Sequence, residues 1–195
     1  MKIGVDIDGT LTDINGWMIE RAIPFAKENN INLTVDESRY DYSEMFDWTD
    51  SDLQKYLERY LIDYFSNVEP EENSVDILNK LKDEGHEIII VTARGTCPQE
   101  LEIIDSEETN KLTVEWLDKN NYHYDKIISN ATNKVKILED EKIDMFIDDV
   151  DTNVYALSKY VPVIVPLRQY NTNIEGKNIT IANSWNEIYK IIKNM

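Results

Sequence analysis

Short apolar runs alternate along this chain with longer amphipathic segments, and this alternation restricts the fold more than any other feature of the sequence. The apolar runs have the length of strands and occupy residues 2–6, 87–92, 126–129, 145–148 and 161–165. Segments with the pattern of helices occupy residues 71–84, 107–120, 133–142, 151–160 and 184–193. Buried strands separated by helices predict an α/β fold, a parallel sheet covered by helices on both faces. Pro162 weakens the assignment of the last strand, because proline is tolerated mainly at the edge of a sheet.

Residues 14–70 interrupt the alternation of strands and helices and contain no convincing strand. Apolar residues recur there at the spacing of one helical face, as in Leu53, Tyr56, Leu57, Tyr60, Leu61 and Tyr64. We therefore expect a small helical cap over residues 14–70, inserted after the first strand. Residues 1–13 and 71–195 then form the α/β core domain. The stretches 93–106 and 166–178 are predicted to be surface loops.

Charge and composition limit the partners of the protein. Its 195 residues include 38 acidic and 20 basic side chains, which gives a formal charge of −18. Such a charge repels nucleic-acid backbones and anionic membranes, so we expect a small-molecule partner, no nucleic acid and no membrane. No apolar run approaches the ~20 residues of a membrane span, and the first apolar run is too short for a secretory leader. The single Cys97 permits no internal disulfide, so we expect a soluble, cytoplasmic protein.

Polar side chains capable of chemistry follow several of the predicted strands. Asp6 ends the first strand and Thr92 ends the second. Asp148 and Asp149 follow the fourth strand, and Lys134 opens the helix after the third. Ligands of open α/β sheets bind beyond the carboxyl ends of the strands, so we expect these groups to meet there. Carboxylates that meet in this way are stabilised by a divalent cation, and Mg²⁺ prefers oxygen ligands.

Four motifs occur in an order that resembles the haloacid dehalogenase-like phosphohydrolase superfamily. They are DIDGT at residues 6–10, the threonine of VTAR, the lysine of NKVKIL and the acidic pair of IDD. The further segments TVEWL and YDKI resemble small bacterial nucleotidases, which are similar to 5'(3')-deoxyribonucleotidases with a helical cap. The resemblance implies a three-layer Rossmann-like core, Mg²⁺ as cofactor and hydrolysis of a phosphate ester through an aspartyl-phosphate.

The resemblance also implies catalytic and metal-binding roles for the acidic residues. Asp6 would be the nucleophile, and the side chain of Asp8 would be the general acid and base. The metal would be held by Asp6, by the main-chain carbonyl of Asp8 and by an acidic residue after the fourth strand. We prefer Asp149 for that last ligand, with Asp148 beside it, although adjacency in the sequence does not decide between the two.

Binding of the phosphoryl group is expected from Thr92, Ala93, Arg94 and Lys134. Lys136 competes with Lys134 for this role. We prefer Lys134, because a cation in the first turn of a helix is unfavourable unless an anion is bound beside it. Arg94 fits two interpretations equally well, a contact with the phosphate or base and a solvated loop charge.

Other residues are explained better by structure than by chemistry. Asp13 is predicted to cap the helix that follows it, and Asn130 or Asn133 to cap the helix after the third strand. Aromatic side chains at helical spacing usually form a core. Five aromatic residues of the segment 14–70 could stack on a nucleobase: Trp17, Tyr40, Tyr42, Phe46 and Trp48. Among them we select Trp17 and Phe46 as substrate contacts that set specificity.

These observations predict a Mg²⁺-dependent phosphomonoesterase that acts on a small phosphate ester, with a nucleoside monophosphate as the preferred substrate. A sugar-phosphate phosphatase or a phosphomutase would use the same core and the same aspartyl-phosphate, so both remain alternatives. The alternative from another class is a nucleotide or phosphate sensor without catalysis. It is disfavoured because a chemically competent residue occupies every catalytic position.

Overall fold

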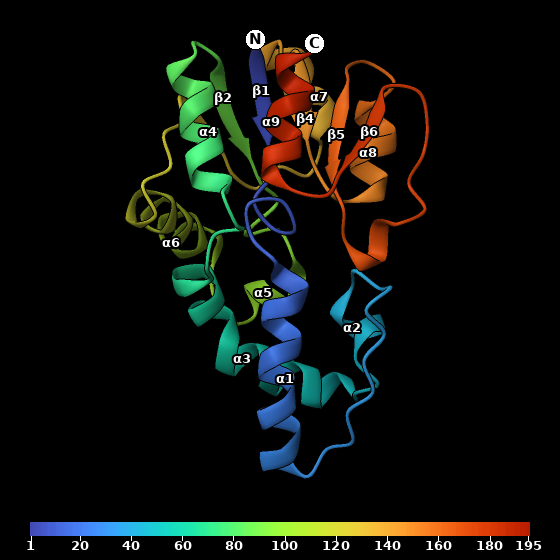
Figure 1. The fold of residues 1–195 in the computed structure, drawn as a ribbon. Coiled ribbons are helices and arrows are strands. Elements are labelled where there is room, and N and C mark those ends of the chain that lie inside the picture. Colours follow the sequence, from blue (N-terminus) through green and yellow to red (C-terminus); the bar gives the residue numbers. More distant parts are fainter.

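A six-stranded parallel sheet forms the centre of the protein, with the strand order β3-β2-β1-β4-β5-β6 (Figure 1). The computed structural model describes residues 1–195, with the exception of the side chain of Gln99. The strands are β1 (Lys2–Val5), β2 (Glu87–Val91), β3 (Lys126–Ile128), β4 (Met145–Ile147), β5 (Val163–Pro166) and β6 (Ile179–Ala182). Because β1 lies between β2 and β4, the residues that follow it lie at the middle of the carboxyl edge.

The five predicted strands are confirmed, but the sheet continues beyond them. β6 was not predicted, because its sequence ITIA is short and follows a polar stretch. Pro162 weakened the prediction of the fifth strand, yet β5 forms and pairs with both β4 and β6, so it is not an edge strand. Pro162 precedes β5, and its carbonyl accepts a hydrogen bond from the Phe146 amide at 3.0 Å. The missing N–H of the proline therefore removes no bond from the ladder.

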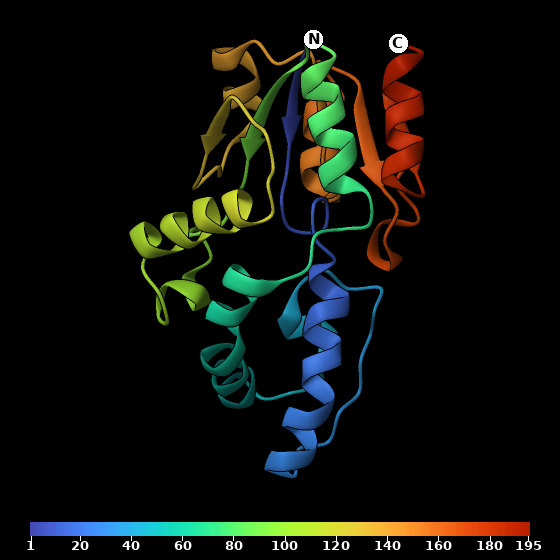
Figure 2. The same cartoon turned by 60° about the vertical axis from the view of Figure 1, so that its left-hand side comes forward.

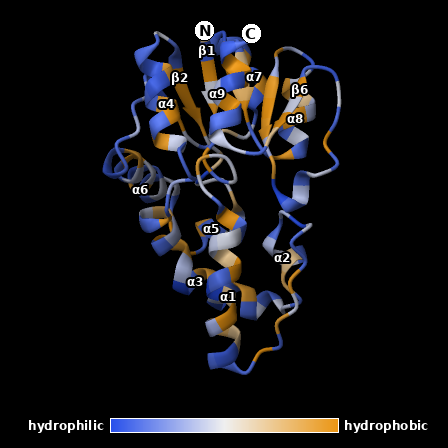
Figure 3. Ribbon diagram, in the orientation of Figure 1, coloured by the Kyte–Doolittle hydropathy of each residue, from blue (hydrophilic) through white to orange (hydrophobic). Residues whose placement is uncertain are grey.

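Helices cover both faces of the sheet and separate two hydrophobic cores. One face carries α4 (Ser74–Asp83), α6 (Ser106–Lys119) and α9 (Trp185–Lys193), and the other carries α7 (Lys134–Glu141) and α8 (Asp151–Leu157). Alternate residues of β2 divide between the cores, with Ile88 and Ile90 on the first face and Ile89 and Val91 on the second. Figure 3 shows the strands as the most hydrophobic elements. The predicted three-layer α/β architecture is thus confirmed.

Residues 14–70 contain α1 (Ile14–Asn29), α2 (Tyr42–Met45) and α3 (Asp50–Asn67). Figures 1 and 2 place these helices beyond the carboxyl ends of the strands, at the far end of the molecule from both termini. The predicted stripe on α3 is buried at Leu53, Tyr56, Leu57, Leu61 and Tyr64. The short helix α5 (Pro98–Leu101) interrupts the predicted loop 93–106. The division into a core domain and a cap domain stays a prediction.

Two predicted helix caps are confirmed. The Asp13 carboxylate accepts a hydrogen bond from the amide of Gly16 at 3.0 Å at the start of α1. Asn133 caps α7 in the same way, by accepting from the amide of Lys136 at 3.0 Å. No helix of the described chain combines the length and the apolar character that a membrane crossing requires.

Arg168 contacts both segments that connect the sheet to residues 14–70, the one before residue 14 and the one after residue 70. Its Nε donates to the Gly9 carbonyl at 2.8 Å, and its Nη2 lies 2.7 Å from a carboxylate oxygen of Glu71. A second link joins α6 to the end of α3, where the Nε1 of Trp116 donates to the Val68 carbonyl at 2.7 Å. These contacts fix the position of the helical segment over the carboxyl edge of the sheet.

The Trp116 link leads to a prediction about stability. We expect Trp116→Phe to lower the free energy of unfolding by about 1–2 kcal/mol, because the buried Val68 carbonyl loses its donor. Urea denaturation measures this loss. Trp48→Phe is the matched control, since the Nε1 of Trp48 donates to the Asn32 carbonyl at an exposed position. Equal losses in the two variants would show that the Trp116 bond has no special role.

Candidate active site

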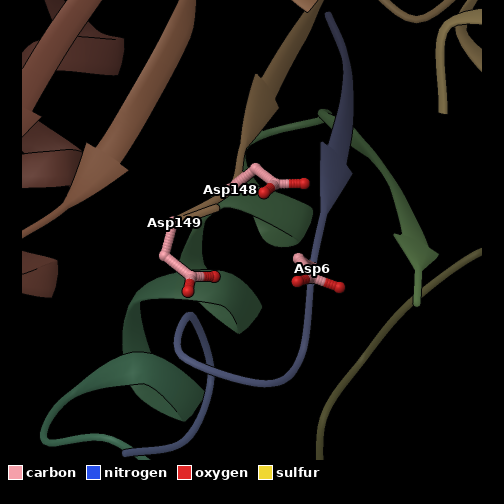
Figure 4. A group of neighbouring side chains, drawn as sticks. All are labelled: Asp6, Asp148 and Asp149. Carbon is pink, nitrogen blue, oxygen red and sulfur yellow. The ribbon is translucent and has the colours of Figure 1, made fainter. Parts of the chain in front are cut away.

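Three buried carboxyl groups meet at the middle of the carboxyl edge. Asp6 directly follows β1, and Asp148 and Asp149 follow the neighbouring strand β4. Each offers an oxygen atom, and these atoms all lie within 4.8 Å of one another. In Figure 4 the carboxyl groups of Asp148 and Asp149 are directed toward the strand that carries Asp6. The sheet topology therefore brings together the acidic residues that the sequence predicted to meet.

Lys134 is the cation of this cluster. It is the first residue of α7, and its side chain is 3% exposed. Its Nζ lies 2.7 Å from an oxygen of Asp148 and 3.0 Å from an oxygen of Asp6. Burial alone would lower the pKa of Lys134, but the two carboxylates more than offset it and hold this pKa above the ordinary value. Lys136 instead pairs with Asp140 on the exposed face of the helix, away from the cluster.

One lysine does not neutralise three carboxylates. Burial raises the pKa of Asp6 well above its ordinary value, Lys134 opposes this rise, and Asp148 and Asp149 add to it. Burial and the neighbouring Asp148 together raise the pKa of Asp149 to about 7. The cluster therefore has an excess of negative charge in a buried setting, which is the condition that a bound divalent cation relieves.

The two acidic residues after β4 differ in what they bind. Asp148 is held by Lys134, by the Val150 amide at 3.1 Å and by the Asn153 side chain at 3.2 Å. The Asp149 carboxylate instead accepts hydrogen bonds from two side-chain hydroxyl groups, that of Thr10 at 3.0 Å and that of Tyr170 at 2.5 Å. A cation that binds Asp149 would have to replace only these hydroxyl groups, which can rotate away. A cation that binds Asp148 would have to displace the buried ammonium group of Lys134. The contacts therefore favour Asp149 over Asp148 as a metal ligand.

Gly9 allows the turn after β1 to lie close to Asp149. Its φ of 76° lies in the left-handed region that favours glycine. A Cβ atom at this position would lie 2.1 Å from an oxygen of Asp149 and 2.4 Å from the hydroxyl of Tyr170. The turn after Asp8 can thus approach the acidic pair only because residue 9 has no side chain.

Asp8 is held by two residues from different parts of the chain. Arg94 donates to its carboxylate from Nη2 at 2.7 Å and from Nε at 3.0 Å. The hydroxyl of Tyr64, on α3, donates to the same carboxylate at 2.5 Å and lies 2.8 Å from the hydroxyl of Thr12. Two charge-assisted bonds and one hydroxyl bond therefore fix the direction of the Asp8 side chain.

Arg94 is fully buried, so the interpretation of a solvated loop charge is wrong. Its guanidinium carbon lies 5.1–5.5 Å from the ring centroids of Tyr64, Phe65 and Trp116. Burial acts to lower the pKa of Arg94, but Asp8 reverses the effect and keeps this pKa above its ordinary value. This charge is compensated by Asp8, and its role in phosphate binding stays a prediction.

Thr92 and Ala93, the other predicted phosphate ligands, also lie at this edge. Thr92 follows β2 and is fully buried, and its hydroxyl accepts a hydrogen bond from the Arg94 amide at 3.2 Å. Ala93 is exposed. Binding of phosphate by either residue stays a prediction.

A cavity of about 160 Å³ opens beside Asp6 and Asp8, and we call it the Asp8 cavity. Its other walls include Ile14, Tyr40, Tyr42 and Glu100. Tyr40 lies in the loop before α2, and Tyr42 is the first residue of α2. Glu100 lies on α5. The cavity therefore lies between the carboxyl edge of the sheet and the helical segment.

The two aromatic residues selected from the sequence as substrate contacts do not line this cavity. Phe46 is 2% exposed and stacks on Trp48 at 4.6 Å between ring centroids. Trp17 is 9% exposed, packs against Tyr64 and is covered by the guanidinium group of Arg21. Both contribute to the interior of the helical segment, and the geometry gives no support to a contact with substrate.

Sequence reasoning missed several residues of the site. Tyr64 was interpreted only as packing of the helical stripe, yet it binds Asp8. Tyr170 lies in a predicted surface loop, yet its hydroxyl binds Asp149 and its ring meets Tyr40 at 5.3 Å. No local pattern marks either residue, because each bond joins segments far apart in the sequence.

The fold of the chain is shared with solved structures of haloacid dehalogenase-like proteins. A structure from Thermotoga maritima described as a "putative beta-phosphoglucomutase" superimposes with a TM-score of 0.65, with 14% identity and all of both chains covered. The haloacid dehalogenase-like protein SP0104 of Streptococcus pneumoniae gives a TM-score of 0.64, with 12% identity, 98% of this chain and 97% of that chain covered. At these identities the likeness shows the fold.

Sequence comparison identifies the family. Residues 1–195 match the family described as 5' nucleotidase, deoxy (pyrimidine), cytosolic type C protein, and the chain belongs to this family. The "Putative nucleotidase YqfW" of Bacillus subtilis strain 168 is 26% identical over 199 residues, covering 100% of this chain and 94% of the relative. A nucleotidase of Clostridium acetobutylicum is 26% identical over 197 residues, covering 100% and 95%. The protein is therefore a hydrolase of phosphoric monoesters.

The central position of Lys134 leads to a second prediction. Without divalent cations, we expect Lys134→Met to lower the free energy of unfolding by about 3–5 kcal/mol, because the buried carboxyl groups of Asp6 and Asp148 lose their cation. Urea denaturation in the presence of a chelator measures this loss. Lys136→Met is the matched control, since its pair with Asp140 is exposed, and its unfolding midpoint should equal that of the wild type. A stable Lys134→Met protein would refute the compensating role of this lysine.

Proposed function

We propose that the protein is a Mg²⁺-dependent phosphomonoesterase that hydrolyses a nucleoside monophosphate through an aspartyl-phosphate on Asp6. The observation that carries this proposal is the excess of buried carboxylates over cations at the carboxyl edge of β1 and β4. A protein gains nothing for its stability from such repulsion, so a functional reason is needed.

The residues present fit Mg²⁺. This ion prefers a small number of carboxylate and carbonyl oxygens and retains sites for water and for a substrate phosphate. Asp6, Asp149 and the main-chain carbonyl of Asp8 would hold it, while Asp148 keeps Lys134 in place. When bound, the ion supplies positive charge that offsets the carboxylates and attracts the phosphoryl group of the substrate.

The proposed reaction has two steps, both made by residues of the chain. In the first, a carboxylate oxygen of Asp6 attacks phosphorus, the bond from phosphorus to the ester oxygen breaks, and Asp8 gives its proton to the departing alkoxide. In the second, Asp8 takes a proton from water, which attacks phosphorus and releases Asp6 and inorganic phosphate. Lys134 and the Thr92 hydroxyl bind phosphoryl oxygens in both steps.

The bonds to Asp8 fix the position of the side chain that this proposal uses. Arg94 and Tyr64 hold its carboxyl group beside the Asp8 cavity and restrict the directions in which it can exchange a proton. Since Tyr64 belongs to α3, the helical segment contributes to the site directly. We propose that residues 14–70 act as a cap that covers the bound ester.

A nucleoside monophosphate is the proposed substrate because the walls of the Asp8 cavity suit a nucleoside. The aromatic side chains Tyr40 and Tyr42 offer apolar faces and hydroxyl groups to a base and a sugar. The names of the relatives, which are nucleotidases, support the same substrate class. A single cysteine and a strongly negative charge fit an enzyme that acts on a soluble metabolite in the cytoplasm.

An activity assay tests the proposed function. With Mg²⁺, we expect the wild type to hydrolyse nucleoside 5'- or 3'-monophosphates more efficiently than sugar phosphates, and Asp6→Asn to reduce kcat by at least about 10³-fold. Release of inorganic phosphate measures both. Asp13→Asn is the matched control, because asparagine caps a helix as well as aspartate does, and it should retain wild-type activity.

The outcomes of this assay separate the alternatives. Hydrolysis of sugar phosphates alone would refute the nucleotide substrate and leave the phosphomonoesterase intact. Full activity of Asp6→Asn would refute the aspartyl-phosphate.

Thermal unfolding tests the proposed metal site without relying on activity. We expect saturating Mg²⁺ to raise the Tm of the wild type by about 5 °C, because the ion binds the folded protein only. Asp149→Asn should lose more than half of this shift. Asp151→Asn, an exposed position in the first turn of α8, should retain all of it. An undiminished shift in Asp149→Asn would place the ion elsewhere.

A further inference from the structure

Glu100 is an acidic residue of the Asp8 cavity that the proposed mechanism does not use. It lies on α5, in the segment that follows β2, and lines the same cavity as Asp6 and Asp8. Across the described part of the chain, its carboxyl group has neither a hydrogen-bond donor nor an ion-pair partner. Glu100 is half-buried and forms part of the wall of the cavity that also borders Asp6 and Asp8.

The cations near this cavity are already compensated. Arg94 is the one positively charged side chain among the described residues that line it, and it is bound to Asp8. Lys134 lies deeper and is bound to Asp6 and Asp148. The wall also includes Asp41, whose carboxylate caps α2 by accepting from the Ser43 amide at 2.8 Å. The acidic side chains on the described wall of this cavity, Asp6, Asp8, Asp41 and Glu100, therefore outnumber Arg94, whose Nη1 atom is left without a hydrogen-bond acceptor.

Such a wall distinguishes leaving groups by their charge. A hydroxyl or amino group can donate to the Glu100 carboxylate, which compensates part of the cost of burying it. A second phosphate or a carboxylate would face Glu100 and Asp41 in a partly desolvated space, where repulsion is much stronger than in water. Burial, together with the charge of Asp8, raises the pKa of Glu100 to about 7, although Arg94 opposes the rise. The carboxyl group is therefore ionised at pH 8.

We propose that Glu100 restricts the enzyme to phosphate esters whose leaving group carries no second anionic group, so that bisphosphates and phosphorylated carboxylic acids are excluded. This inference rests on the proposed function, because it concerns the leaving group of the same reaction. Glu100 is thus a specificity-determining residue, and it acts against unsuitable substrates more than in favour of the correct one.

The inference also separates the phosphatase from the phosphomutase that shares its chemistry. A phosphomutase returns the phosphoryl group of its aspartyl-phosphate to a sugar that already carries a phosphate, so its cavity must accept a second anion. The wall formed by Glu100 and Asp41 opposes that anion. The reaction that supplies this enzyme with substrate must therefore yield a monophosphate with an otherwise neutral organic group.

A matched pair of substrates tests this inference. Thymidine 5'-monophosphate and thymidine 3',5'-bisphosphate have the same 5' ester and differ in one phosphate. We expect the wild type to prefer the monophosphate in kcat/KM at pH 8 and expect Glu100→Gln to reduce this preference by about tenfold, because glutamine keeps the size and loses the charge. Glu102→Gln is the matched control, since it removes a charge from an exposed position two residues along the chain and should leave the preference unchanged.

Each outcome has a distinct meaning. Equal kcat/KM for the two substrates in the wild type, or an unchanged preference in Glu100→Gln, would overturn the inference and leave the phosphatase standing. A preference that falls equally in Glu102→Gln would assign the effect to the overall charge and would also overturn it. No hydrolysis of either substrate or of any other phosphate ester would refute the proposed function itself. The same assay on 2-hydroxyethyl phosphate and phosphoglycolate repeats the comparison with a carboxylate as the second anion.

Discussion

The contact of Lys134 with Asp6 and Asp148 is the interaction on which the site depends. Two neighbouring parallel strands end in carboxylates, and Lys134 lies between them and favours their ionised form, which burial and mutual repulsion disfavour. A lysine in the first turn of a helix is itself unfavourable, because it lies at the positive end of the helix dipole. The buried lysine and the buried carboxylates would each destabilise the fold alone, and their ion pairs offset this cost. Lys134 offsets one of the three carboxyl groups, and the oxygens of Asp6, Asp148 and Asp149 lie close enough together for a divalent cation to bind among them.

Hydrogen bonds to Asp8 and Asp149, the latter through Tyr170 and its contact with Tyr40, connect residues 14–70 to this acidic cluster. Asp8 receives bonds from Arg94 after β2 and from Tyr64 on α3, so its direction is set by elements on both sides of the cavity. Tyr170 joins Asp149 to the ring of Tyr40 in a similar way. Placement of residues 14–70 over the sheet is therefore coupled to the positions of the reacting groups. A displacement of this segment would change the orientation of Asp8 as well as the access to the cavity.

The sequence predicted the parts of the structure that depend on local patterns. β1, β2 and β4 are predominantly apolar, so they were recognised, and the residues at their ends could be placed at one edge by topology alone. β6 was missed because it is short, and its pairing with β5 depends on a long intervening loop. The burial of Arg94 could not be predicted, since arginine is usually solvated and its partner Asp8 lies 86 residues away. The bonds from Tyr64 and Tyr170 were missed for the same reason, because side-chain pairing between distant segments leaves no periodic signal.

The central claim is that a divalent cation held by the acidic strand ends presents phosphorus to Asp6. A crystal structure of the protein with Mg²⁺ and beryllium fluoride, which mimics a phosphoryl group bonded to a carboxylate, tests this claim most directly. We expect the beryllium fluoride on a carboxylate oxygen of Asp6, with the cation held by Asp6 and Asp149. Beryllium fluoride on Asp8, or a cation bound away from both strand ends, would contradict it.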